Sequence, residues 1–394
     1  MVLVAGSIIS MVGFGVRSSF GLFLDPMTTS LGWSRETFAL AMAIQNLLWG
    51  IGLPFAGALA DRYGPVSVII VGAIIYALGV FGMTVSGDPL VFQFTAGLIA
   101  GIGVAFTSFS IAMASMVRVV GVERRSLVLG VGTAAGSCGQ VLFSPLAQGF
   151  ISNFGWSSAL IWLALIILVL IPLAIAMPND PDLAAESHLQ QTLRQAIREA
   201  TGHRGFVLLT TGFFVCGFHV AFITVHFPAY VKDLGLDPLV GAWSISLIGL
   251  FNIAGSLLSG LFGQNHSKKV GLATIYFTRA VVILLLLLAP KTELTIYLFA
   301  AAMGLLWLST VPLTNGIVAQ VFGVRYLATL FGIVFLSHQL GSFLGVWLGG
   351  VIYDRTGSYN GMWIAGIVLG LMAAIIHVPI DEKPLSRLAP RENA

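Results

Sequence analysis

Two arginines lie in the middle of long apolar runs, where a permanent positive charge is rare. Arg17 lies within residues 2–24 and Arg279 within residues 269–289, and no Asp or Glu lies in the interior of any such run. A guanidinium at the centre of a bilayer costs from about 2.5 to more than 10 kcal/mol, so it normally faces a partner or a wet cavity. For Arg17 we expect an anionic substrate as that partner, with snorkelling or capping of helix carbonyls as the alternative. For Arg279 we expect contacts with backbone carbonyls or polar groups of a neighbouring helix, with substrate contact as the alternative.

Three histidines, His219, His226 and His338, lie well inside apolar runs and supply groups that titrate near neutral pH. His219 precedes His226 by seven residues, about two helical turns, so both face one side of a helix, and His338 lies in a later run. Because the interiors of the runs contain no carboxylate, His219 and His338 are the candidates for proton coupling. The alternative is a neutral histidine that only makes hydrogen bonds. No acidic or cysteine pattern accompanies these residues, so the sequence predicts neither a metal site nor a cofactor.

Amide side chains in other runs can complete a substrate site. Together with Arg17, His219 and His338, the candidate substrate-binding residues are Gln45, Asn46, Gln140, Asn252, Asn315 and Gln339. Buried amides also hold membrane helices together, which is the alternative for each of them. Trp49 and Trp307 either wall the cavity or pack in the core.

The composition indicates the kind of elements that position these residues. The chain has 394 residues, of which 57% are apolar and 9% charged, whereas a soluble domain carries about 25% charged residues. Cutting at charges and turn residues gives twelve runs, at 2–24, 35–59, 65–86, 89–116, 126–151, 157–177, 205–231, 237–262, 269–289, 293–318, 326–350 and 360–379. Runs of this length are typical of membrane helices. We therefore expect an all-α membrane protein with about twelve transmembrane helices in two pseudo-symmetric six-helix bundles.

Several other classes of protein are not favoured. The net charge is +3 and the basic residues lie in short loops without a basic stripe, so no nucleic-acid partner is expected. Cys138 and Cys216 lie in apolar runs and suggest no disulfide framework. The sequence contains no Walker loop, nucleophile elbow, metal-ligand helix or paired carboxylates, so we do not expect an enzyme.

The chain divides into two repeated halves. We expect an N-terminal six-helix bundle at 1–178, a cytoplasmic linker containing a surface helix at 179–204, a C-terminal bundle at 205–380 and a cytoplasmic tail at 381–394. A constant offset of 202 residues aligns Gly15 with Gly217, Phe20 with Phe222, Pro26 with Pro228 and Gly139 with Gly341. Parallel repeats of this kind place the solute site between the halves near the middle of the bilayer. The glycines of the fifth run, 126–151, are expected to allow close helix contact and rocking; they are Gly130, Gly132, Gly136 and Gly139.

The distribution of basic residues predicts the orientation. With both termini on one side, the loops of that side hold thirteen Lys and Arg residues and the opposite loops hold four. Positive residues are retained on the cytoplasmic side of a membrane. We therefore expect a multi-pass protein of the inner membrane with both termini in the cytoplasm.

The loop after the second run carries a recognisable motif. Gly57, Asp61, Arg62 and Gly64 form a Gly-x-x-x-Asp-Arg-x-Gly pattern that resembles the loop between helices 2 and 3 of the major facilitator superfamily. The resemblance implies that these residues contribute to a cytoplasmic gate. Pro65 stands where the family usually has a basic residue, so part of that charge network is missing.

Within this superfamily the sequence is most similar to the monocarboxylate and oxalate:formate carriers. The likeness rests on Gly13–Leu24 followed by Leu31–Arg35, on Phe154–Trp156 and on Gly332–Ser342. It implies that Arg17 corresponds to a cation on helix 1 and His338 to a lysine on helix 11. Ser256 and Asn252 stand where the family has a helix 8 arginine and, in animal members, an aspartate, which argues against lactate–proton symport.

These features predict a secondary transporter that moves a small organic anion, most simply a carboxylate, by alternating access through proton symport or anion exchange. Two alternatives remain at this stage, an exporter of amphipathic drugs or metabolites and a transporter-like solute sensor. We expect a monomer whose partners are the solute, protons and membrane lipids.

Overall fold

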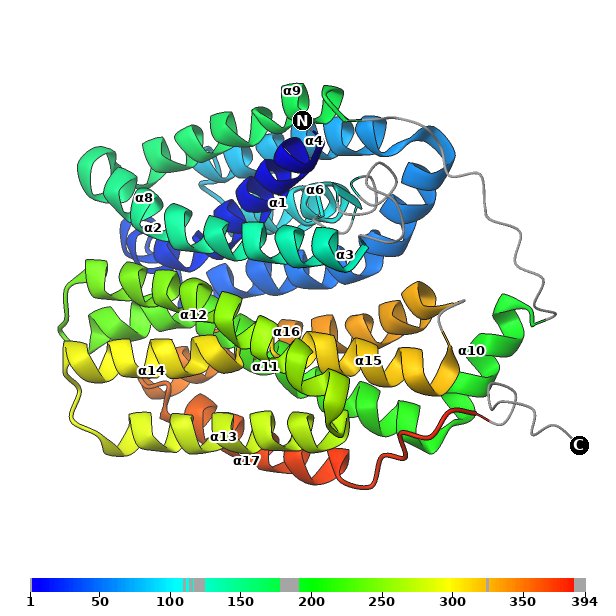
Figure 1. The fold of residues 1–394 in the computed structure, drawn as a ribbon. Coiled ribbons are helices and arrows are strands. Elements are labelled where there is room, and N and C mark those ends of the chain that lie inside the picture. The colour runs from blue at the N-terminus through cyan, green and yellow to red at the C-terminus, as the bar shows by residue number, and fades with distance from the viewer. Residues whose placement is uncertain are drawn as a thin grey trace, which may run out of the picture.

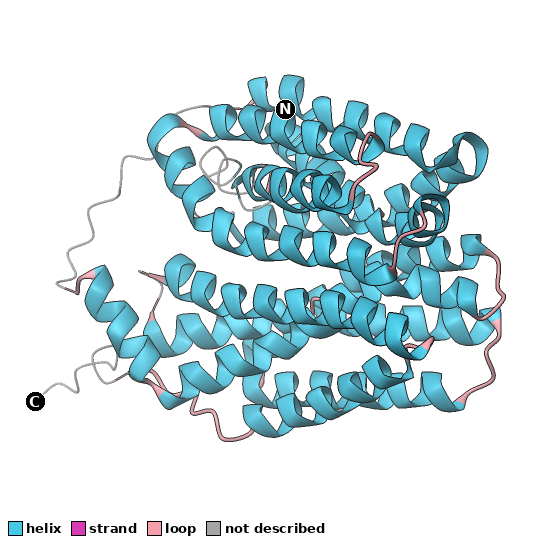
Figure 2. Cartoon of the chain, turned by 180° about the vertical axis from the view of Figure 1, so that it is seen from behind, coloured by secondary structure: helices cyan, strands magenta, loops and turns pink. Residues whose placement is uncertain are grey.

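The computed structural model describes residues 2–108, 111–112, 116, 125–177, 191–323 and 326–385, except for the side chains of Asp61, 125–130 and 133. The described part of the chain is almost entirely helical (Figure 2). The expected run 89–116 and tail 381–394 therefore lie partly outside the described residues.

The first half of the chain forms one group of helices, drawn in blue to green in Figure 1. Its elements are α1 (Val2–Ser18), the 3-10 turn η1 (Phe20–Phe23), α2 (Leu24–Leu31), α3 (Arg35–Tyr63), α4 (Pro65–Thr84), α5 (Pro89–Phe92), the π-helix η2 (Gln93–Ile99), α6 (Ala100–Phe106), α8 (Arg125–Leu168) and α9 (Leu170–Ile175).

The second half forms the other group, drawn in green to red, below the first in Figure 1. Its elements are α10 (Leu193–Gly202), α11 (Arg204–Asp233), α12 (Pro238–Asn265), α13 (Lys268–Leu288), α14 (Glu293–Leu306), α15 (Thr310–Phe322), α16 (Leu327–Thr356) and α17 (Asn360–His377).

The helices account for twelve membrane crossings. Within the described ranges, eleven continuous segments are long and apolar enough to span a bilayer, and one of them, Ala134–Ile175, has 42 residues. A straight helix of that length would measure about 63 Å, twice the hydrocarbon thickness of a bilayer. The segment instead breaks at Gly155, whose φ of 79° is a left-handed conformation that glycine adopts without strain. The prediction of about twelve helices, with a break around Phe154–Trp156, is confirmed.

The two halves are built around equivalent close helix pairs. In the first half α1 packs on α8, where a Cβ added at Gly139 would lie 2.0 Å from Met11 O. In the second half α11 packs on α16, where a Cβ added at Gly341 would lie 2.0 Å from Phe214 O. Because Gly139 and Gly341 are related by the 202-residue offset, the structure confirms the repeat, and it confirms the predicted close helix contact at Gly139.

The halves meet along α3 and α16, and along α8 and α12. A Cβ added at Gly50 would lie 2.7 Å from the Gln339 side chain, whereas one at Gly57 or Gly332 would meet nothing within 4 Å. Gly57 follows Gly50 by two helical turns, and Gly332 precedes Gln339 by the same distance, so all four positions face the same interface. The helices therefore separate toward the end of the molecule that carries α10 and the C-terminal segment, as Figure 1 and Figure 2 show. We call this the linker end and the opposite one the Arg35 end.

A surface helix follows the first half, as predicted for the linker. α10 begins with a capping box in which Thr192 and Gln195 exchange hydrogen bonds, and it packs on α11. Residues 178–190 lie outside the described residues, so the proposed domain boundaries at 178 and 204 stay predictions.

The glycine contacts lead to a test of the α11–α16 pair. We expect Gly341→Ala to lower the free energy of unfolding by about 1–3 kcal/mol, because a methyl group must be forced against the Phe214 carbonyl. Gly332→Ala in the same helix is the matched control, since its methyl group meets open space and only adds helix propensity. Thermal unfolding in detergent measures both variants. Equal melting temperatures for the two would show that the close pair does not need this glycine.

Candidate functional site

Arg17 projects from α1 into the region where the two halves meet, and its partners are neutral. Its Nη2 donates a hydrogen bond to Asn46 Oδ1 of α3. The guanidinium lies over the Trp49 ring, 4.4 Å from its centroid, and Nε has no hydrogen-bond partner among the described residues. Among the side chains that the structure describes, no carboxylate forms an ion pair with Arg17. The described side chains therefore orient this positive charge without neutralising it.

A chain of rings connects Arg17 to the second half. The Trp49 ring packs edge-on against Phe335 of α16, with centroids 5.4 Å apart. Phe335 in turn stacks on His338, at 5.5 Å. Cation–π and aromatic contacts of this kind join charged and apolar groups in dry surroundings. Arg17 and His338, from opposite halves, thus share one aromatic cluster at the interface.

Gln339 belongs to the same neighbourhood. Its side chain packs on Gly50 of α3, and its Oε1 lies 3.3 Å from His338 Nδ1. Gln339 is fully buried, and its Nε2 has no hydrogen-bond partner among the described residues. Four predicted residues, Arg17, Asn46, His338 and Gln339, are therefore brought together, and two of them present unused donors.

A small cavity adjoins Arg17. It has a volume of about 10 Å³ and is lined by Gly13, Phe14, Arg17, Trp49, Val104, Thr107 and Ser108. This volume holds about one water molecule. In this conformation the region around Arg17 is therefore packed too closely for a carboxylate, and a substrate would require the helices around it to move.

Two other predicted residues hold the halves together elsewhere. Gln140 Nε2 of α8 donates to Ile245 O of α12 at 3.0 Å. Asn252 Nδ2 of α12 donates to Ser137 Oγ of α8 at 2.9 Å, and its Oδ1 accepts from Leu308 N. These contacts match the alternative interpretation of buried amides as helix-to-helix contacts.

The remaining candidates lie apart from Arg17. Gln45 donates to Ala96 O within the first half, and His219 contacts Gly366 O of α17 through Nε2 at 2.8 Å. Asn315 is partly buried and makes no hydrogen bond to a described residue. The arrangement does not bring these three residues to the Arg17 cluster.

Arg279 contacts backbone carbonyls, as predicted. It is fully buried and its Nη2 donates to Leu306 O at 2.6 Å and to Trp307 O. These carbonyls lie at the end of α14, where the last residues of a helix lack intrahelical partners and the helix dipole favours a positive charge. Arg279 thereby stabilises the break between α14 and α15.

The predicted gating loop is shaped by glycine and proline. α3 ends at Tyr63, Gly64 adopts a φ of 85°, and Pro65 begins α4. The Arg62 guanidinium lies 5.1 Å from the centroid of the Tyr63 ring. The Asp61 side chain is outside the described residues, so the gating role of this loop stays a prediction.

The sequence analysis missed a charged cluster at the Arg35 end, which we call the Arg35 lock. Arg35, at the start of α3, donates two parallel hydrogen bonds to the Asp233 carboxylate of α11, at 2.6 and 2.7 Å. It also donates to Tyr359 OH at 3.0 Å and lies 3.7 Å from the centroid of the Tyr353 ring. Bidentate arginine–carboxylate pairs are the strong form of this interaction. The lock therefore fastens the first half to the second.

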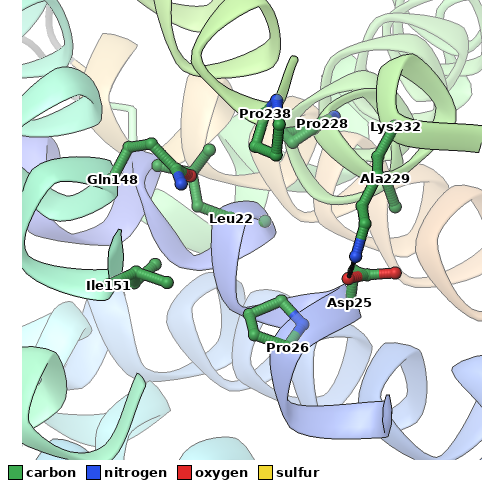
Figure 3. Close-up of a pocket in the computed structure, with 10 residues that line it drawn as sticks. Leu22, Asp25, Pro26, Gln148, Ile151, Pro228, Ala229, Lys232 and Pro238 are labelled. Atoms are coloured by element: carbon green, nitrogen blue, oxygen red, sulfur yellow. Dashed lines mark hydrogen bonds and ion pairs between the residues drawn. The ribbon is translucent and has the colours of Figure 1, made fainter. Parts of the chain in front are cut away.

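Two further contacts belong to the Arg35 lock. Asp354 of α16 accepts from the backbone nitrogens of Arg35 and Glu36, at 3.0 and 2.7 Å, and so caps the free N–H groups of α3 from the other half. Asp25 of α2 pairs with Lys232 of α11. Figure 3 shows these two side chains pointing toward each other beside a cavity of about 170 Å³ between the halves.

The signal for the lock was present in the sequence but could not be interpreted without the fold. Its charged residues all lie at ends of apolar runs, on the side that the topology assigns to one face of the membrane. Their pairing joins residues 198 and 319 positions apart, and no local spacing shows such contacts.

The lock leads to a second prediction. Asp233→Asn removes the charge that faces Arg35, so we expect the Arg35 end to open more often. A cysteine at Leu22, which lines the cavity and is buried, should then react about tenfold faster with a water-soluble thiol reagent, which corresponds to about 1.4 kcal/mol. The measurement uses a Cys138→Ser background because Cys138 is exposed.

Asp237→Asn is the matched control for this experiment. Asp237 carries the same charge nearby but caps the start of α12 through Leu239 N, a role that asparagine also fills. Equal labelling rates in the two variants would show that the Arg35–Asp233 pair does not hold the halves together.

Comparisons with known proteins agree with this architecture. The model of the Major Facilitator Superfamily matches residues 6–269 and 209–394. The fold is similar to that of a bacterial homolog to the human lysosomal transporter Spinster, in an inward-facing and occupied conformation, with a TM-score of 0.76 and 12% identity over 95% of each chain.

Relatives in sequence agree with the predicted branch. The chain is 26% identical over 364 residues to monocarboxylate transporter 13 of Rattus norvegicus, covering 90% of this chain and 82% of that protein. It is 23% identical over 344 residues to the oxalate:formate antiporter of Oxalobacter formigenes, covering 86% and 81%. The chain therefore belongs to the Major Facilitator Superfamily of membrane transporters and is similar to its monocarboxylate and oxalate:formate carriers.

Proposed function

We propose that this protein is a secondary transporter for a small organic anion, a carboxylate in the simplest case, and that Arg17 binds the negative charge of the solute. The observation that carries the proposal is the set of neutral partners around Arg17, namely the Asn46 amide and the Trp49 ring. A buried charge without a counter-ion is costly. An anionic solute would supply the missing negative charge, and the Arg17 guanidinium, which the Asn46 hydrogen bond already orients, would bind it.

The names of the relatives support the carboxylate class. One is a monocarboxylate transporter and another is an oxalate:formate antiporter. Arginine donates parallel hydrogen bonds that fit the two oxygens of a carboxylate. His338 and Gln339 would receive the solute from the second half, since Gln339 Nε2 is an unused donor beside the Arg17 cluster.

We also propose an orientation and a conformation. The excess of Lys and Arg on one side favours the linker end, with both chain termini, in the cytoplasm of an inner-membrane protein. The Arg35 lock then lies on the outer side, and the helices separate toward the inside. The two bundles, 1–178 and 205–380, would rock about the site between them in a chain that acts as a monomer, with coupling by proton symport or anion exchange.

Changing Asn46 tests the proposal without removing Arg17. Asn46→Asp keeps the size of the side chain and places a carboxylate against the guanidinium. A fixed anion in the site, worth a few kcal/mol, would exclude the solute. We therefore expect the rate of carboxylate counterflow in proteoliposomes to fall below about one hundredth of the parent rate. Arg17→Ala should abolish transport, and Arg17→Lys, which keeps the charge, should retain part of it.

The folding of these variants provides the control. Asn46→Asp should raise the melting temperature because it pairs a buried charge, so a loss of transport would not reflect unfolding. If Asn46→Asp or Arg17→Ala transports carboxylates normally, the guanidinium is structural and the proposal is wrong. Export of uncharged amphipathic compounds by Arg17→Ala would favour the drug-exporter alternative.

A further inference from the structure

His226, on α11, lies at the centre of the contacts that close the Arg35 end. It is fully buried. Its Nδ1 lies 3.0 Å from Tyr359 OH, and its Nε2 lies 2.8 Å from Val346 O of α16. Gly349 makes room for the ring, because a Cβ there would lie 2.5 Å from Nε2. The imidazole thus connects α11 to α16 and to the start of α17.

The partners of His226 fix its protonation and its tautomer. A carbonyl oxygen only accepts, so Nε2 carries the hydrogen that it donates to Val346 O. Arg35 only donates, so Tyr359 OH accepts from Arg35 Nη1 at 3.0 Å and uses its own hydrogen to donate to His226 Nδ1. Burial raises the pKa of Tyr359 above its ordinary value, so the hydroxyl keeps that hydrogen. A directed chain runs from Arg35 through Tyr359 and His226 to Val346, and it requires a neutral histidine.

A proton on Nδ1 would disrupt this chain in two ways. It would occupy the acceptor that Tyr359 uses, so the Tyr359 hydrogen would need a new acceptor in a buried site. It would also place a second positive charge two hydrogen bonds away from the Arg35 guanidinium, where like charges repel. Arg35 belongs to the first half, whereas Tyr359 and His226 belong to the second. Separation of the halves at this end relieves both effects.

The other charges of the region are engaged with one another. Asp233 faces Arg35, Asp25 faces Lys232, and Asp354 caps the start of α3. The titratable and charged groups around His226 come from each packed element: Arg35 and Glu36 of α3, Asp25 of α2, Tyr230, Lys232 and Asp233 of α11, Tyr353 and Asp354 of α16, and Tyr359 before α17. Of the cations, Arg35 is the one that reaches the hydrogen-bond chain.

We propose that His226 is the proton-binding site of the outer gate, and that a proton bound there opens the Arg35 lock. The role of this proton in transport rests on the proposed function. Within that function, the inference assigns proton coupling to His226 in place of His219 or His338. Protonation from the Arg35 side favours opening to that side, and return to the neutral form re-forms the chain and closes it. This order of events links a proton taken up from the Arg35 side to access from that side.

The test measures the opening of the lock directly and needs no substrate. Spin labels are attached to cysteines at Ser30 of α2 and Asn360 of α17, which are exposed positions in opposite halves at the Arg35 end, in the full chain with Cys138→Ser. The distance between the labels is measured by electron–electron resonance at about pH 8 and about pH 5, on either side of the ordinary histidine pKa. We expect a longer-distance population to appear on acidification.

Two variants and one control identify the titrating group. His226→Gln keeps a donor for Val346 O but cannot gain a charge, and Tyr359→Phe removes the hydroxyl while keeping the ring; both should give distance distributions that do not change between the two pH values. His219→Gln is the control, because His219 is also buried in α11 and also contacts a carbonyl, Gly366 O. It should respond to acid as the parent does.

The possible outcomes separate this inference from the proposed function. An acid response that persists in His226→Gln assigns the titration to another group, such as the lock carboxylates, and overturns the inference. A parent protein without any acid response overturns it as well. Either result leaves the Arg17 experiments unaffected, because they measure carboxylate transport, and a failure of those experiments leaves the distance measurement unaffected.

Discussion

The structure is organised around one electrostatic constraint, a guanidinium held inside a membrane protein without a counter-ion among the described side chains. Arg17 is oriented by Asn46 and packed on Trp49, and both partners are neutral. Arg279, in contrast, donates to a carbonyl at the end of α14, and Arg35 is paired with Asp233. Arg35 is thus paired with a carboxylate, and Arg279 has two carbonyl partners, although its Nε and Nη1 have no hydrogen-bond partner among the described residues. Arg17 lies between the halves, where, under the proposed function, an anionic solute would approach it from either side as the halves rock.

The region around Arg17 and the Arg35 lock lie at different levels of the interface between the halves. The interface between α3 and α16 is close at the level of Gly50 and Gln339 and is fastened at the Arg35 lock, but it is open at the level of Gly57 and Gly332. Gly139 and Gly341 let the helices of each pair pack closely within its own half. Under the proposed function, the halves would move as units about their shared interface, so a change in the lock would be transmitted to the site around Arg17.

Sequence reasoning succeeded where the information was local or repeated. The apolar runs predicted the crossings, and the 202-residue offset predicted the repeated halves. Arg17 and His338, two of the predicted site residues, share one aromatic cluster, and their role in binding stays a prediction. It could not resolve the direction of side chains. His219 is the repeat mate of Arg17, yet its short ring reaches only α17, whereas the longer arginine side chain reaches α3. The Arg35 lock was not predicted because opposite charges at several helix ends allow many pairings, and only the three-dimensional packing selects one.

The central claim, that the solute supplies the negative charge for Arg17, is tested most directly by comparing ligands that differ only in charge. Small carboxylic acids and their amides of the same shape are added to the purified protein, and the melting temperature is recorded for each pair. Ligand that binds the folded state raises this temperature by mass action. The account predicts that at least one carboxylate stabilises the protein while its amide does not, and that Arg17→Ala removes the difference. Stabilisation by amides as strong as by their acids, or an unchanged response in Arg17→Ala, would contradict it.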